Sequence, residues 1–141
     1  MNKKTIIRLS FGILILVLLL IAIGVTYYPE LQKQQEKKTI DTIKANNTKF
    51  IQKALLEFSS EFNIKPSAVA QKTADALNKT EKNPFDKKAL PFSFDANCKG
   101  ASCIEHDDNL RMIILTTYDK KGNLKARSVI KPPSYVTYFK D

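Results

Sequence analysis

The residues most capable of chemistry in this chain lie close together in the sequence. Cys98 and Cys103 enclose four residues, and His106, the only histidine, is followed by Asp107 and Asp108. Thiolate, imidazole and carboxylate groups are the usual protein ligands of zinc, and a cysteine near a histidine is a minimal nucleophile and base. The cluster therefore raises two questions, whether the chain holds a metal ion and whether it is an enzyme.

The cysteine spacing favours a disulfide over either chemistry. A zinc ribbon needs a second pair of ligands, and the chain has only two cysteines. A disulfide-bonded Cys103 cannot attack a substrate, which leaves His106 beside Asp107 and Asp108 as a solvated turn. In an exported chain we expect a Cys98–Cys103 disulfide, which contributes at most about 2 to 3 kcal/mol because its loop is short. Two free thiols are expected instead if the domain faces the cytosol.

Other motifs for catalysis or cofactor binding are missing from the sequence. The chain has four glycines and neither a glycine-rich phosphate loop nor a nucleophile elbow. The segment Asp95–Gly100 begins like a calcium loop, but Lys99 stands at a ligand position and His106 at the closing position, which requires an acid. We predict that the protein is not an enzyme and has no cofactor, no metal and no small-molecule substrate.

The chain is strongly basic. Its 23 Lys+Arg against 14 Asp+Glu give a formal net charge of +9, which favours anionic partners. Five basic residues are expected on the outer face of a C-terminal hairpin, with Tyr135 and Tyr138 nearby for stacking: Lys120, Lys121, Lys125, Arg127 and Lys131. Weak contact with DNA or another polyanion is one interpretation. The favoured one is a solvated face that keeps a sheet edge from aggregating.

The first thirty residues contain a long uncharged run. Between Leu9 and Tyr28 only Ser10, Thr26 and two tyrosines interrupt the apolar residues, which matches a helix crossing about 30 Å of hydrocarbon. Positive residues precede the run and aromatic residues end it, as at the cytoplasmic side and the headgroup region of a membrane. These flanking residues are Lys3, Lys4 and Arg8, then Tyr27 and Tyr28.

This pattern predicts a single-pass protein of the inner or plasma membrane. We expect a basic cytoplasmic leader over residues 1–8, a transmembrane helix over 9–28, and a C-terminal domain in the periplasm or outside the cell. A signal peptide cleaved after Gly24 is the alternative, since Ala22–Gly24 is a tolerable cleavage site. The apolar run continues past that site to Tyr28, which favours a permanent anchor.

A second helical pattern follows the membrane run directly. From Pro29 to Phe62, apolar residues recur at spacings of three and four, so we expect an amphipathic helix over 29–62 that continues the anchor. Its weakest point is predicted at Asn46–Thr48, where helix propensity is low. The part from Ile40 to Phe62 should lie under a sheet. The full stripe is Leu31, Ile40, Ile43, Phe50, Ile51, Ala54, Leu55, Phe58 and Phe62.

The remaining residues, 63–141, predict a small α+β domain. Pro66 opens a short helix over 66–78, with Val69, Thr73, Ala76 and Leu77 facing inward. An ordered loop is expected from Lys79 to Asp95 because its two prolines forbid regular structure.

Strands are predicted in the C-terminal third. The apolar run 110–118 indicates a central strand covered on both faces, and the alternating residues 124–131 indicate its partner. Together they form an antiparallel hairpin over 110–131. Shorter strands are predicted over 101–105 and 135–139.

Parts of the sequence resemble type IV pilins and pseudopilins. Phe11 is similar to the aromatic residue that opens the mature chain in that family, and Ile21–Gly24 is similar to its apolar segment ending in glycine. Asn83–Phe85 is similar to an Asn-Pro-aromatic turn before the sheet of many pilin-like proteins. The resemblance implies a long helix packed against a small antiparallel sheet, and leader cleavage between Ser10 and Phe11.

Two positions depart from the family pattern. The family has glycine where this chain has Ser10, and an acidic residue where this chain has Ile15. In pilins that carboxylate is understood to pair with the N-terminal amine of the neighbouring subunit, since an unpaired charge in lipid is expensive. Its absence indicates a capping, initiating or degenerate minor member, or a simple bitopic protein.

We therefore expect a subunit that acts by assembly into a type IV pilus or type II secretion-like filament, or by capping or initiating one. Its partners would be the membrane and other pilin-like subunits, in homo- or hetero-assembly. The expected contact residues are Phe11, Ile15, Gly24, Tyr27, Tyr28 and Pro29. The alternative is a monomeric bitopic protein whose extracytoplasmic domain binds a ligand or an envelope partner.

Overall fold

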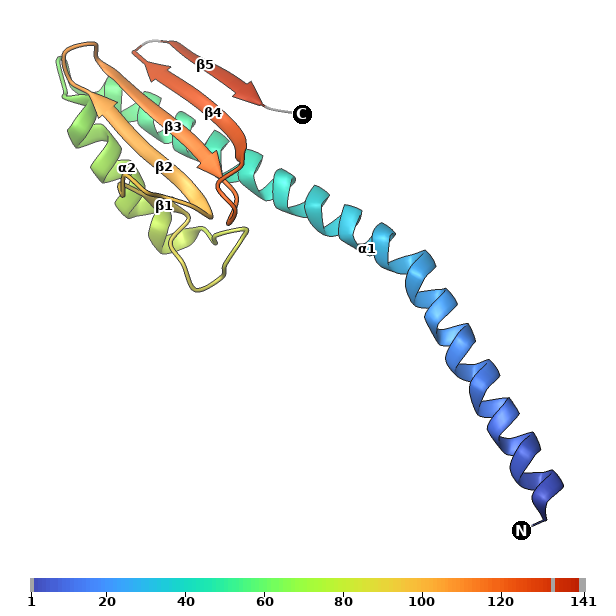
Figure 1. The fold of residues 1–141 in the computed structure, drawn as a ribbon. Coiled ribbons are helices and arrows are strands. Elements are labelled where there is room, and N and C mark those ends of the chain that lie inside the picture. Colours follow the sequence, from blue (N-terminus) through green and yellow to red (C-terminus); the bar gives the residue numbers. More distant parts are fainter. Residues whose placement is uncertain (1, 133, 140–141) are drawn as a thin grey trace. The chain divides into compact units, whose positions relative to one another are not determined.

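The computed structural model describes the backbone of residues 2–132 and 134–139, and the side chains of residues 2–132. It confirms the predicted α+β class (Figure 1). In chain order the elements are α1 (Lys3–Ser60), α2 (Pro66–Thr80), β1 (Phe92–Ser93), β2 (Ala101–Asp107), β3 (Met112–Tyr118), β4 (Leu124–Lys131) and β5 (Ser134–Phe139). The chain divides into two compact units, residues 1–38 and 39–141, and each is described by itself.

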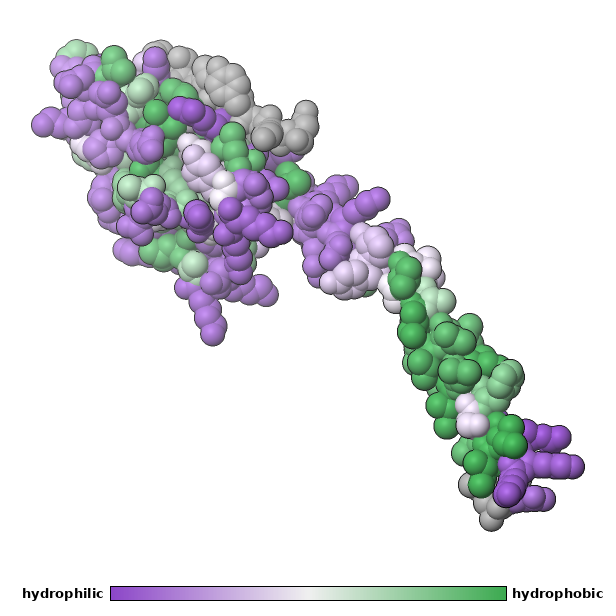
Figure 2. All heavy atoms as spheres, viewed as in Figure 1, coloured by the Kyte–Doolittle hydropathy of each residue, from purple (hydrophilic) through white to green (hydrophobic). Residues whose placement is uncertain are grey.

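The first unit is the N-terminal part of α1. The helix includes Pro29 without ending there, as predicted. Every described residue up to Lys38 is exposed. Figure 2 shows a continuous hydrophobic surface on the segment that follows the basic N-terminal residues. This unit therefore has no core of its own.

The second unit is a sheet with both helices on one face. The strand order is β1-β2-β3-β4-β5, so β3 is central, as predicted. The neighbouring pairs from β2 to β5 are antiparallel, but β1 lies parallel to β2, which corrects the expectation of a purely antiparallel sheet. β1 arises within the predicted loop from Lys79 to Asp95, where two residues are too few to give a strand signal.

The core lies between the helices and the sheet. α1 contributes Phe50, Ile51, Ala54 and Phe58, α2 contributes Val69, Ala70, Ala74 and Leu77, and the strands contribute Phe92, Ile104, Ile113, Leu115 and Ile130. The rings of Phe50 and Phe92 are 5.0 Å apart. Within α2, Ala76 is only half-buried, whereas Ala70 and Ala74 are buried in its place.

Two predictions about burial were too broad. The helical stripe is buried only from Ile43 to Phe58, since Ile40 is exposed and Phe62, beyond the end of α1, is 93% exposed. Strand β3 is not covered on both faces: Ile113 and Leu115 are buried, but Met112 and Ile114 are half-buried. The reason is that both helices pack on the face that Ile113 and Leu115 share.

The asparagines of α1 overturn the predicted weak point of the helix. Asn46 and Asn47 are buried, the latter to 1% exposure. Asn46 Nδ2 donates to the Lys82 carbonyl at 3.0 Å, and Asn47 Nδ2 donates to Thr117 Oγ1 at 3.0 Å. The Ser102 hydroxyl donates to Asn47 Oδ1 at 2.9 Å. The bonds of Asn47 fix the position of α1 along β2 and β3, and the bond of Asn46 joins α1 to the loop after α2, because a shifted helix would leave buried amides without partners.

A third asparagine, Asn78, closes one edge of the sheet. Asn78 of α2 accepts a hydrogen bond from the Phe92 amide at 3.0 Å and donates one to the Phe92 carbonyl at 3.1 Å. Its side chain thus occupies the backbone groups of β1 that a further strand would use.

Candidate assembly and binding surfaces

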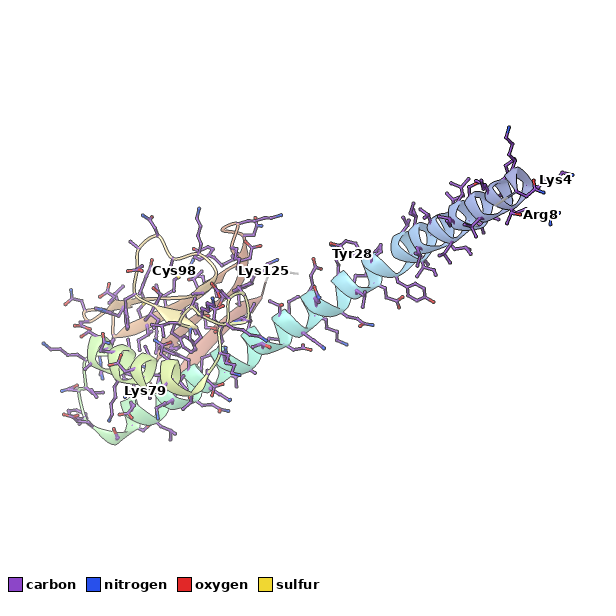
Figure 3. All side chains as sticks on the ribbon, turned by 90° about the horizontal axis from the view of Figure 1, so that it is seen from below. Lys4, Arg8, Tyr28, Lys79, Cys98 and Lys125 are labelled. Carbon is purple, nitrogen blue, oxygen red and sulfur yellow. A yellow bond between two sulfur atoms is a disulfide. The ribbon has the colours of Figure 1, made fainter. Side chains whose placement is uncertain are left out.

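The largest candidate surface is the apolar run of α1. This is a helix long and apolar enough to cross a membrane, and the most apolar window of eighteen residues has a mean hydropathy of 2.9 with none of it buried. A signal sequence near an N-terminus meets the same criteria. The side chains project from all sides of the ribbon up to Tyr28 (Figure 3).

The two aliphatic hydroxyls of the run are hydrogen-bonded within the helix and need no partner outside it. Ser10 Oγ donates to the Ile7 carbonyl at 2.9 Å, and Thr26 Oγ1 donates to the Ala22 carbonyl at 2.8 Å. Such bonds back to the preceding turn satisfy the hydroxyl within the helix. The backbone is likewise satisfied by the helix, which is the condition for stability in lipid.

The residues predicted for cleavage and assembly all lie within α1 and are exposed. Ser10 and Phe11 lie well inside the helix, and Ile15, Tyr27, Tyr28 and Pro29 follow along it. A Cβ added at Gly24 would meet nothing within 4 Å. Packing among the described residues of the first unit therefore does not explain this glycine, although an interior helical glycine costs about 1 kcal/mol relative to alanine.

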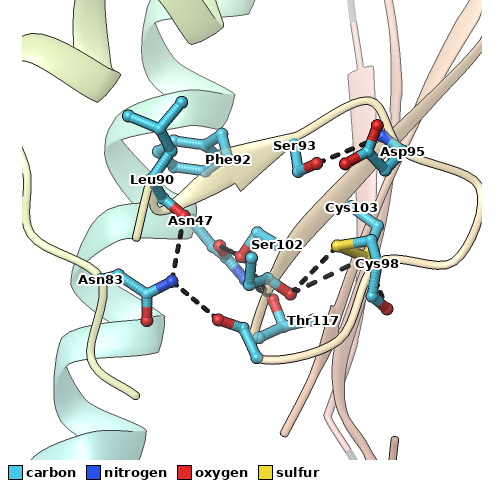
Figure 4. The surroundings of a disulfide bond; sticks show 12 residues. Asn47, Asn83, Leu90, Phe92, Ser93, Asp95, Cys98, Ser102, Cys103 and Thr117 are labelled. Carbon is cyan, nitrogen blue, oxygen red and sulfur yellow. Dashed lines mark hydrogen bonds between the residues drawn. A yellow bond between two sulfur atoms is a disulfide. The ribbon is translucent and has the colours of Figure 1, made fainter. Parts of the chain in front are cut away.

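The predicted disulfide is present at the start of β2. Cys98 and Cys103 are joined at 2.03 Å, and Figure 4 shows the surrounding hydrogen bonds. Gly100, inside this loop, has a φ of +67°, and its amide donates to the Asp119 carbonyl at 3.0 Å. The disulfide loop is thereby joined to the turn between β3 and β4.

Asn83 joins a third segment to this region. Its Nδ2 donates to the carbonyls of Gly100 at 2.7 Å and Leu90 at 2.9 Å, and its Oδ1 accepts from the amides of Phe85 and Asp86. The Asn-Pro-aromatic sequence is therefore a structural junction in this chain, with Asn83 buried and Pro84 and Phe85 half-buried. From the sequence alone it was a tripeptide of common residues, and its partners at Leu90 and Gly100 gave no local signal.

The five predicted basic residues separate into two groups. Lys120 and Lys121 lie in the turn after β3, whereas Lys125, Arg127 and Lys131 share the face of β4 that points away from the helices. Lys125 Nζ lies 3.7 Å from Asp119 Oδ2. Hydrogen bonds from Asn123, then from the Lys121 amide, and the charge of Lys125 lower the pKa of Asp119. The predicted stacking partners Tyr135 and Tyr138 have side chains outside the described part of the chain.

The predicted turn at His106–Asp108 begins later than expected, because His106 and Asp107 are the last two residues of β2 and only Asp108 lies in the turn. Asp108 accepts hydrogen bonds from the backbone amide and the hydroxyl of Ser67, both at 2.9 Å, which docks this turn on the start of α2. These bonds lower the pKa of Asp108, with a smaller contribution from His106 at 3.8 Å. Across residues 2–132, no three His, Cys, Asp or Glu side chains are grouped so that they could hold a metal ion.

A surface groove lies between α2 and the segment from Ala89 to Ala101. Its volume is about 630 Å³, and its lining includes Asp75, Asn78, Leu90, Phe94, Asp95 and Lys99. The groove borders the loop from Lys79 to Asp95. Its lining mixes carboxylates, amides and a lysine with apolar side chains, among them Leu90, Phe92 and Phe94, which does not select one class of ligand.

No protein-family model matches the chain, and no curated protein or solved structure matches it significantly.

Proposed function

We propose that this protein is a single-pass membrane subunit that acts by packing its apolar helix against other subunits of a pilin-like filament. The observation that carries the proposal is the two-part character of α1. Its residues 9–28 are apolar and exposed on all sides, and its residues 43–58 bury one stripe under a sheet. This layout suits a subunit held in lipid before assembly and by neighbouring helices afterwards.

The proposed topology places the N-terminus in the cytoplasm and the sheet in an oxidising compartment, the periplasm or the cell exterior. Lys3, Lys4 and Arg8 precede the apolar run, and such residues are retained on the cytoplasmic side. The Cys98–Cys103 disulfide is the kind of bond that persists outside the cytosol. Leader cleavage before Phe11 and a role in capping or initiation belong to the same proposal.

Gly24 gives the proposal a specific contact. Small residues let membrane helices approach closely, and no described residue of the first unit fills the space beside this glycine. In the assembled state a neighbouring helix would lie against Gly24. Since Ile15 replaces the acidic residue of the family pattern, this packing would hold the subunit without the buried ion pair.

Site-directed cross-linking along α1 tests the proposal. Single cysteines replacing Leu14, Leu18 or Ile21 in the membrane-inserted full chain should give ladders of oligomers on oxidation, and Gly24→Leu should weaken them. A cysteine replacing Leu56, which is exposed on the sheet-bearing unit, is the matched control. Monomers alone at every position in the apolar run, in membranes that contain the native partners, would contradict assembly and favour a tethered binding domain.

The N-terminus and intact mass of the membrane-bound protein separate the processing alternatives. A chain beginning at Phe11 supports pilin-type processing, whereas one beginning at Val25 identifies a cleaved signal peptide and overturns the anchor. An intact chain beginning at Met1 supports a permanent anchor without processing.

A further inference from the structure

Three loops of the sheet-bearing unit meet at one end of the sheet. They are residues 81–91, 94–100 and 119–123. The Asn83 side chain donates to the Gly100 carbonyl, and the Gly100 amide donates to the Asp119 carbonyl. The Lys99 side chain lies against Gly122. We call this group of loops the basic end.

Six exposed lysines lie in the basic end: Lys82, Lys87, Lys88, Lys99, Lys120 and Lys121. None of them forms an ion pair with another residue in the described side chains, 2–132. The loops also contain four acidic residues, but Glu81 pairs with Lys49 at 2.9 Å and Asp119 lies beside Lys125. The six lysines are therefore opposed only by Asp86 and Asp95.

The opposite end of the sheet lacks this excess of positive charge. Its turns, residues 61–65 and 107–111, contain three acidic residues and two basic ones. Both ends expose apolar side chains, since Phe62 is 93% exposed at that end and Leu90 and Phe94 are 59% and 40% exposed at the basic end. Charge, not apolar exposure, distinguishes the two ends.

The chain enters the sheet-bearing unit beside the basic end. Asn46, one turn after the buried Ile43, donates to the Lys82 carbonyl in the first of the three loops. Residues 29–45 separate the apolar run from Asn46, where α1 contacts the basic end. Even fully extended, these seventeen residues reach about 60 Å, so an anchored chain keeps the basic end within that order of distance of the bilayer.

We propose that the basic end binds anionic lipid headgroups of the membrane that holds the apolar run. Clustered lysines close to a membrane are attracted to its anionic lipids, and exposed apolar side chains such as Leu90 and Phe94 can enter the boundary region beside them. The proposal uses only the membrane anchor from the proposed function and does not depend on filament assembly. It also accounts for the lysines that lie outside the predicted hairpin face.

Hydrogen exchange of the full chain in vesicles tests this proposal. One vesicle preparation contains phosphatidylcholine alone and the other contains phosphatidylcholine with phosphatidylglycerol. We expect the amides of residues 85–90 and 120–123 to exchange about fivefold more slowly in the second preparation. Each lysine that binds an anionic headgroup disfavours the loop opening that exchange requires. High salt should remove the difference, since it screens exposed charges, and residues 61–65 and 107–111 should be unaffected.

Two matched variants test whether protection depends on the lysines of the basic end or only on the total positive charge of the chain. Replacing Lys87, Lys88, Lys120 and Lys121 by glutamine should abolish the protection. Replacing Lys53, Lys65, Lys72 and Arg111 by glutamine removes as many charges and should retain it. Equal exchange of the native chain in both preparations, or equal loss of protection in the two variants, would overturn the proposal.

Flotation and a nucleic-acid competitor complete the test. A chain that floats with both vesicle types but shows no protection overturns docking and leaves the anchor intact, whereas one that floats with neither overturns both. If duplex DNA protects the basic end more strongly than phosphatidylglycerol at equal phosphate concentration, the surface binds nucleic acid and the lipid proposal is wrong.

Discussion

The apolar run of α1 and the buried stripe further along the same helix differ in how they use polar groups. In residues 9–28 the two aliphatic hydroxyls bond back to their own helix. In residues 43–58, Asn46 and Asn47 bond to groups on distant segments. The first region can pack against lipid or against apolar side chains, because it needs no hydrogen bonds from its surroundings. The second specifies one partner and one register.

This comparison predicts that mutations in the two regions affect different properties. The largest effect on folding should come from Phe50→Asp, because Phe50 is fully buried and its replacement leaves a charge and a cavity in the core. A loss of more than about 4 kcal/mol should unfold the sheet-bearing unit while flotation with membranes persists. Denaturant unfolding measures this, with Leu56→Asp, at a 70% exposed position, as the control. A folded, protease-resistant Phe50→Asp protein would disprove the core assignment.

The converse prediction concerns the apolar run. Leu18→Arg places a charge near its centre and should shift membrane insertion by about 3 kcal/mol, with denaturant unfolding of the sheet-bearing unit unchanged. Flotation of the newly made chain measures insertion, and Leu56→Arg serves as the control. Undiminished insertion of Leu18→Arg would show that the bilayer does not contact this part of α1.

Asn47→Ala should have the next largest effect. It removes two buried hydrogen bonds and leaves a small cavity, so unfolding should become about 2 to 3 kcal/mol easier. The Ser102 and Thr117 hydroxyls, 2.7 Å apart, still bond to each other, which limits the loss. Thr48→Ala, at an exposed neighbouring position, is the control for helix propensity. A change as small as that of the control would mean that the asparagine does not fix the helix.

Reduction of the disulfide should cost slightly less. The Cys98–Cys103 loop is short, and the chain-entropy model gives about 2 kcal/mol for such a loop. Denaturant midpoints with and without reductant measure the loss, and Cys98→Ser with Cys103→Ser should abolish the effect of reductant. Flotation should not change. Reduction that leaves the midpoint unaltered would show that Asn83 and Gly100 hold these loops without the bond.

The smallest expected effect is a pH dependence from Asp108. Hydrogen bonds from Ser67 lower its folded-state pKa below the ordinary value of 3.8. Its contribution is therefore complete above that value and is lost as the pH falls through the lower, folded-state pKa. Asp108→Asn should flatten part of the acid limb of the unfolding curve. Identical acid limbs for the native chain and Asp108→Asn would exclude this contribution.

Sequence reasoning succeeded where the signal was local. Strand β4 was predicted with its observed bounds because alternation over 124–131 is visible in the chain itself. Pro66 marked the start of α2 for the same reason. The uncharged run likewise identified the candidate membrane segment.

Sequence reasoning failed where the deciding partners were distant. Asn47 was read as a weakness of the helix because propensity considers only neighbours, whereas its partners Ser102 and Thr117 lie 55 and 70 residues away. The half-exposed face of β3 was missed because a run of four apolar residues does not reveal that both helices pack on one side. The six lysines of the basic end belong to three separate loops, so no single stretch of sequence displays the cluster.

The pairing of Asn78 with the backbone of Phe92 has a consequence for how copies of this protein meet. Chains anchored in a membrane are concentrated in two dimensions. Pairing between the exposed edge strands of two sheets could then nucleate amyloid-like stacks. The Asn78 side chain hinders such pairing at the β1 edge, since an incoming strand would first have to displace its two hydrogen bonds to Phe92. If the proposed membrane assembly is correct, crowded copies would associate through their apolar helices rather than through this edge of the sheet.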